Sequence, residues 1–114
     1  MHELPVTENI LEIATRHARE AGAKRITSVH LVIGQLASIV DDSVQFYWDI
    51  VSKNTPAEGA LLHFKRIPTE MQCLDCQQRY APNDEDMACP ACGSAHIKVV
   101  AGEEFYLEAI EVER

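Results

Sequence analysis

The sequence predicts an α+β protein in which two helices pack on a small three-stranded sheet, mixed or antiparallel, with a cysteine-rich lobe inserted between the last two strands. Two observations support this fold class. Apolar residues recur at helical spacing in two segments and alternate with polar residues in the strand-like segments. All cysteines lie between the last two strand-like segments. At 114 residues, 46% of them apolar, the chain can form one core and a small appendage.

The first predicted helix runs from Leu4 to Ala21. Its apolar residues recur at steps of three and four, and charged residues occupy the opposite side. Pro5 suits the start of the helix, and Gly22 can adopt the left-handed conformation that closes the last turn. His17 lies on the apolar side, so we expect it in the core.

A strand and a second helix follow. Residues 25–33 are rich in β-branched side chains and precede Gly34, a pattern that predicts a strand. Asp41, Asp42 and Ser43 offer side chains that can cap a helix. The apolar stripe of this second helix consists of Val44, Tyr47, Trp48 and Val51.

Residues 60–67 and 105–112 alternate between apolar and polar side chains and predict strands two and three. Because residues 69–98 leave the sheet after one strand and return into the other, the simplest expectation is an antiparallel pair with a protruding lobe. Residues 1–68 and 99–114 would then form an α/β domain, and residues 69–98 an inserted lobe.

The charge balance limits the classes of partner. Eighteen acidic residues against ten basic ones give a formal net charge of −8, which argues against nucleic acid. The sequence has neither a membrane-spanning apolar stretch nor a signal peptide, so we expect a cytoplasmic protein without membrane contact.

Four cysteines form a C-x2-C-x12-C-x2-C array: Cys73, Cys76, Cys89 and Cys92. Two residues between paired cysteines let both sulfurs converge on one metal ion, and two such pairs complete a tetrahedral zinc site. The alternatives are two disulfides, which a reducing cytosol disfavours, or a redox-active pair, which would not need a partner pair. His96 could replace a cysteine, but a solvated loop histidine is the simpler interpretation.

The lobe has too few large apolar residues to fold about 30 residues without a cross-link. Bound zinc would supply the missing free energy, on the order of 10 kcal/mol or more. Four thiolate ligands leave no open coordination position, so the predicted zinc-ribbon lobe is structural and not catalytic.

The segment Met1-His2-Glu3 is a second candidate metal site. The α-amine of Met1, the next amide nitrogen and the His2 imidazole can form fused chelate rings, and the Glu3 amide nitrogen or carboxylate can supply a fourth donor. Such a nitrogen-rich set suits Ni(II) or Cu(II). The alternative is that His2 is an exposed terminal residue without a function.

In combination, these motifs resemble the hydrogenase maturation nickel chaperones of the HypA/HybF family, over nearly the whole chain. The residues that carry the resemblance are Met1-His2-Glu3, Ile33-Gly34-Gln35-Leu36, Ala57-Glu58-Gly59-Ala60, Cys89-Pro-x-Cys92-Gly93-Ser94 and Ile110-Glu111-Val112-Glu113. One departure is Gln35, where an acidic residue is expected.

The resemblance implies that Met1, His2 and Glu3 bind Ni(II) as cargo and that the four cysteines bind structural Zn(II). It further implies delivery of nickel to a [NiFe]-hydrogenase large subunit together with a HypB-type accessory GTPase, with no catalysis by the chain itself. Monomer and homodimer both stay open. The competing functions are a non-catalytic zinc-ribbon assembly subunit and, less favoured by the net charge, a nucleic-acid-binding module.

Overall fold

The structure is a computed structural model that describes residues 3–82 and 86–114. These residues divide into two compact units. The first comprises the described residues up to Val32, together with 38–65 and 106–114, and the second comprises 33–37 and the described part of 66–105. The domain boundaries predicted from the sequence, with residues 1–68 and 99–114 in one domain and residues 69–98 in an inserted lobe, stay a prediction.

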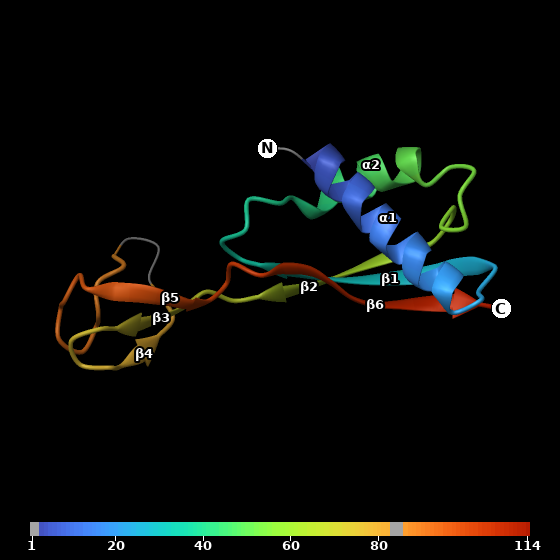
Figure 1. The fold of residues 1–114 in the computed structure, drawn as a ribbon. Helices are drawn as coiled ribbons and strands as arrows, with labels where there is room; N and C mark the ends of the chain where they lie inside the picture. The colour runs from blue at the N-terminus through green and yellow to red at the C-terminus, as the bar shows by residue number, and fades with distance from the viewer. Residues whose placement is uncertain (1–2, 83–85) are drawn as a thin grey trace. The chain divides into compact units, whose positions relative to one another are not determined.

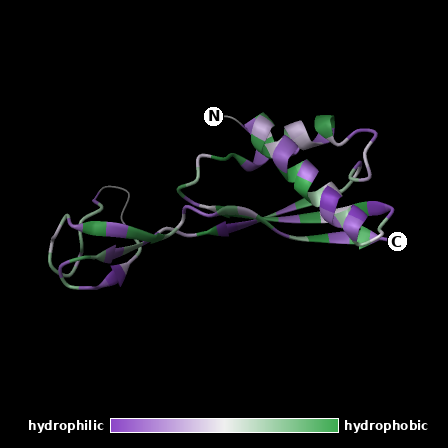
Figure 2. Ribbon diagram, in the orientation of Figure 1, coloured by the Kyte–Doolittle hydropathy of each residue, from purple (hydrophilic) through white to green (hydrophobic). Residues whose placement is uncertain are grey.

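The first unit contains two helices and most of a three-stranded sheet, whose strand ends belong to the second unit (Figure 1). The helices are α1 (Glu3–Glu20) and α2 (Asp41–Val51), and the strands are β1 (Arg25–Gly34), β2 (Leu61–Ile67) and β6 (Phe105–Glu113). Both helices lie on the same face of the sheet, and Figure 2 shows polar and apolar residues mixed along α1, as expected of an amphipathic helix. The predicted fold class is confirmed.

The sheet is mixed, with strand order β2-β1-β6. The N–H of Gln35, just after β1, donates to the carbonyl of Ile67 at the end of β2 (2.8 Å), so these strands run parallel. The N–H of Lys24, just before β1, donates to the carbonyl of Glu113 at the end of β6 (2.9 Å), so β6 runs antiparallel. The expected direct pairing of residues 60–67 with 105–112 was therefore wrong. The strand between them is β1, whose largely apolar sequence suits the most buried position.

Two local expectations in the helices also need correction. The N-cap residue of α2 is Val40, without a side-chain cap; Asp41 is already helical. His17 is exposed and not in the core, because the buried side of α1 is narrower than its apolar pattern suggested. Trp48 is fully buried, as its predicted packing role requires.

The second unit has its own antiparallel sheet of order β4-β3-β5. Its strands are β3 (Glu70–Cys73), β4 (Arg79–Tyr80) and β5 (Ile97–Ala101). All three are short, and they hold in place the turns that carry the cysteines (Figure 1). No helix in the described part of the chain is long and apolar enough to cross a membrane.

Candidate metal centre

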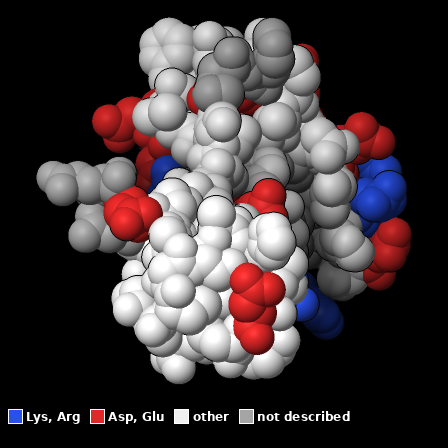
Figure 3. Space-filling view, turned by 90° about the vertical axis from the view of Figure 1, so that its left-hand side faces the viewer, with Lys and Arg blue, Asp and Glu red and all other residues white. Residues whose placement is uncertain are grey.

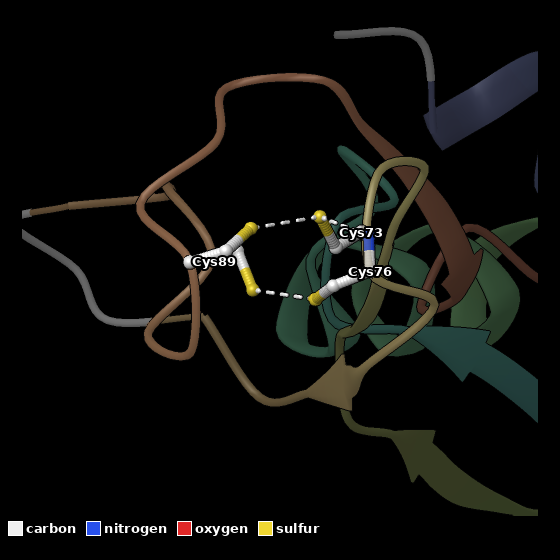
Figure 4. A group of neighbouring side chains, drawn as sticks. Cys73, Cys76 and Cys89 are labelled. Carbon is white, nitrogen blue, oxygen red and sulfur yellow. Dashed lines mark hydrogen bonds between the residues drawn. The ribbon is translucent and has the colours of Figure 1, made fainter.

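The four cysteines of the C-x2-C-x12-C-x2-C array converge in the second unit. The sulfur atoms of Cys73 and Cys92 are 3.5 Å apart, and those of Cys76 and Cys89 are 3.6 Å apart (Figure 4). All four sulfurs lie within 4.8 Å of one another. Cys73 and Cys89 are buried, whereas Cys76 and Cys92 are exposed.

These distances distinguish between the two alternatives for the array, disulfide bonds and a metal site. A disulfide would bring two sulfurs to about 2.0 Å, but all four cysteines are free. Tetrahedral zinc at about 2.3 Å from each sulfur requires sulfur–sulfur separations of about 3.8 Å. The two separations of 3.5 and 3.6 Å lie close to this value, and all four sulfurs lie within 4.8 Å of one another, so the cluster fits a zinc site.

The backbone explains why each cysteine pair can turn its sulfurs inward. The N–H of Gln77 donates to the carbonyl of Cys73 (3.0 Å), and the N–H of Gly93 donates to the carbonyl of Cys89 (2.8 Å). The residue after each pair has a left-handed backbone conformation, with φ of 67° at Gln77 and 75° at Gly93. The two turns therefore have the same conformation. In the first, the N–H of Cys76 also points at the Cys73 sulfur, at 3.4 Å.

The electrostatics of the cluster favour a cation. The N–H of Cys76 helps to lower the pKa of Cys73 to about 7, although desolvation opposes it. At Cys92 the N–H of Ser94 acts in the same direction, but the neighbouring thiols, Cys73 first, and desolvation outweigh it and raise the pKa to about 12. Four clustered sulfurs cannot all carry negative charge alone, and a divalent cation removes this repulsion.

A second set of contacts joins the two cysteine turns outside the sulfur cluster. The hydroxyl of Ser94 donates to the Asp75 carboxylate, and this hydrogen bond lowers the pKa of Asp75. The carbonyl of His96 accepts the N–H of Leu74 at 2.7 Å. The His96 ring lies 3.6 Å from Asp75, and its side chain is 77% exposed. His96 therefore stays outside the four-sulfur group, as a loop residue.

Gln77 provides a test of this geometry. A left-handed backbone conformation is unfavourable for a residue with a Cβ. The second turn has Gly93 at this position, whereas the first turn has Gln77. We expect Gln77→Gly to stabilise the metal-loaded second unit by about 1 kcal/mol. Thermal unfolding of the zinc-loaded protein measures the change. A loss of stability would contradict the assigned conformation, and Gln78→Gly, at a position without a positive φ, is the matched control.

The predicted nickel ligands are only partly visible. Met1 and His2 lie outside the described residues. Glu3 begins α1, is 6% exposed, and its carboxylate accepts the N–H of Val40 at 3.3 Å. Its carbonyl accepts the hydroxyl of the buried Thr7 at 2.6 Å. The side chain of Glu3 is therefore engaged at the N-terminus of α2, a contact across 37 residues that sequence periodicity could not reveal.

The family model described as "Hydrogenase/urease nickel incorporation, metallochaperone, hypA" matches residues 1–112. The chain belongs to the HypA family. A Hydrogenase maturation factor HypA of Dehalococcoides mccartyi is 44% identical over 113 residues, covering 99% of this chain and 95% of that protein. One from Caldanaerobacter subterraneus is 40% identical, covering 99% of this chain and all of that protein. The resemblance found in the sequence is thereby confirmed.

Two solved structures of HypA proteins share the fold. One is titled the solution structure of HypA protein; it is 24% identical, with a TM-score of 0.76, and covers 98% of this chain and 96% of that one. The Ni metallochaperone HypA from Helicobacter pylori is 23% identical, with a TM-score of 0.69, over 99% of this chain and 98% of that one. The chain is thus a member of a nickel metallochaperone family for hydrogenase maturation.

Proposed function

We propose that this chain is a non-catalytic nickel metallochaperone of the cytoplasm. Met1, His2 and Glu3 capture Ni(II), and Cys73, Cys76, Cys89 and Cys92 hold a structural Zn(II). The nickel passes to a [NiFe]-hydrogenase large subunit with the help of a HypB-type GTPase. The observation that carries this proposal is the family match, which extends from residue 1 and so includes both candidate metal sites.

The start of α1 supports the role of the terminal segment. The first four N–H groups of a helix have no acceptor within the helix. Because α1 begins at Glu3, its amide nitrogen can lose a proton and bind nickel without breaking a helical hydrogen bond. The carboxylate already accepts the Val40 N–H, which makes the main-chain nitrogen the freer donor of the two. The carboxylate instead anchors the first turn.

The four-sulfur cluster supports a separate, structural role for zinc. When bound, zinc supplies a cross-link and a positive charge. All four positions of a tetrahedral ion would be filled by protein sulfurs, which leaves no position for a substrate. The residues around the cluster orient the sulfurs through backbone N–H groups. The chemistry of delivery then belongs to the N-terminus, where nickel can move to a partner by ligand exchange.

The charge distribution supports a protein partner over a nucleic acid. The formal net charge is −8, and the face drawn in Figure 3 is mostly uncharged, with several acidic side chains and a few separate basic ones. A nucleic-acid interface requires a continuous basic surface. A zinc-ribbon assembly subunit without nickel chemistry is the remaining alternative, and a single substitution separates it from the metallochaperone.

That substitution is His2→Ala. We expect it to reduce hydrogenase maturation in nickel-limited cells to the level of a strain lacking this protein, because it removes the imidazole donor. Zinc content and melting temperature should stay unchanged, since a residue ahead of the first helical turn contributes little to the core. Excess nickel should partly restore maturation by mass action.

The matched control is His17→Ala, which removes an exposed histidine from α1. It should leave maturation and nickel binding unchanged. Full maturation in nickel-limited His2→Ala cells would contradict the metallochaperone proposal and favour the assembly subunit.

A further inference from the structure

Two of the five histidines meet on the sheet of the first unit, on neighbouring strands. The rings of His30 in β1 and His63 in β2 are stacked, with centroids 4.6 Å apart and planes inclined by 13°. On the other side of β1, Nε2 of His30 lies 2.8 Å from Oε1 of Glu111 in β6. Each of the three strands therefore contributes one side chain with a metal-binding atom to this cluster.

We propose that His30, His63 and Glu111 form a second binding site for a divalent first-row transition metal. Imidazole nitrogens suit Ni, Cu and Zn ions, and a carboxylate is a common additional ligand. With neutral imidazoles the cluster carries the single negative charge of Glu111, which favours a dication. This site shares no residue with the N-terminal segment or the cysteine cluster, and the proposal does not depend on the proposed function.

The distance between His30 and Glu111 suits a shared ion. With metal–ligand bonds of about 2.1 Å, a nitrogen and an oxygen bound at a right angle are about 3.0 Å apart, close to the 2.8 Å between His30 and Glu111. The ring of His63, whose centroid lies 4.6 Å from that of His30, is the neighbouring third donor.

One side chain must turn before all three donors face one ion, because stacked rings direct their nitrogens in parallel planes. His63 can make this change. Its side chain is exposed, and its Nε2 has a hydrogen-bond distance of 3.3 Å to Ser28, at the long end of the range. The torsion that rotates the ring is a soft one. His30 and Glu111 are 33% and 63% exposed, so an ion can enter from solvent.

The test uses the full-length protein with its cysteines loaded with zinc and with His2→Ala, so that the N-terminal imidazole is absent. Ni(II) is titrated by equilibrium dialysis, and paramagnetic line broadening of amide signals locates it. We expect one further nickel ion, with broadening centred on His30, His63 and Glu111. His30→Ala, His63→Ala and Glu111→Gln should each weaken binding about tenfold or more. His17→Ala, which removes an exposed histidine outside the cluster, should change it less than twofold.

Two outcomes would overturn the proposal. One is nickel affinity that stays within twofold in all three cluster variants. The other is broadening centred elsewhere, including the N-terminus or the cysteines. His63→Ala and Glu111→Gln alter exposed side chains, so the test does not depend on His30→Ala folding normally. Because the parent protein lacks His2, a failed nickel-chaperone proposal would leave this result interpretable.

Discussion

Replacing Cys73 with serine is expected to release zinc from the second unit and to unfold that unit. Cys73 is fully buried and closes the cluster through its 3.5 Å contact with Cys92. A hydroxyl is a poor zinc ligand, and bound zinc contributes on the order of 10 kcal/mol to folding. The strands β3, β4 and β5 of the second unit are short. They therefore provide little folding free energy that could substitute for the bound metal.

Metal analysis and amide NMR spectra measure this effect. The wild-type protein should contain about one zinc per chain. In Cys73→Ser, zinc should fall to near zero and the signals of residues 70–101 should collapse, while those of α1 and α2 stay dispersed. Leu74→Ser changes an exposed residue of the same turn and should retain zinc. Full zinc occupancy with native signals in Cys73→Ser would contradict the structural role of the cluster.

Replacing Gly34 with alanine is expected to destabilise the protein by about 3 kcal/mol. A Cβ at Gly34 would lie 2.0 Å from the carbonyl oxygen of Gly102 and 2.6 Å from the nitrogen of Glu103. These are backbone atoms and cannot rotate away. The segments are also joined by hydrogen bonds, because Gly34 donates to Glu104 (2.6 Å) and Leu36 donates to Gly102 (2.7 Å). The two backbone segments would have to move apart to make room for the methyl group.

Chemical denaturation measures the loss, and Gly59→Ala is the control. Gly59 has a positive φ of 81° but nothing within 4 Å of an added Cβ. Its replacement should cost about 1 kcal/mol, from backbone strain alone. Equal losses in the two variants would show that the close approach at Gly34 has no energetic consequence.

The sequence predicted the elements of the first unit well because their periodicity is local. The stripe of Val44 and Trp48 identified α2, and alternation identified β2 and β6. Strand order was not predictable in this way. It depends on which strand becomes most buried, and β1 takes the central position between β2 and β6.

In the candidate sites, too, local features were predictable from the sequence and long-range contacts were not. Four cysteines at short, regular spacing identify their cluster directly, because the turn that joins each pair is local. The approach of His30 to His63 and of Glu3 to Val40 depends on register and packing over more than 30 residues. The strands β3, β4 and β5 were missed because each is short and their arrangement follows from the cysteine turns.

The most direct test of nickel capture at the N-terminus is a nickel titration of the zinc-loaded protein in two forms. One form begins at Met1, and the other has a short extension ahead of Met1. The extension removes the free α-amine but leaves His2, Glu3 and the cysteines unchanged. Calorimetry should show, beside any binding at His30, His63 and Glu111, tight binding of one nickel ion to the unextended form, at least about a hundredfold weaker in the extended form, with equal zinc in both. Equal nickel affinity in the two forms would contradict nickel capture at the N-terminus.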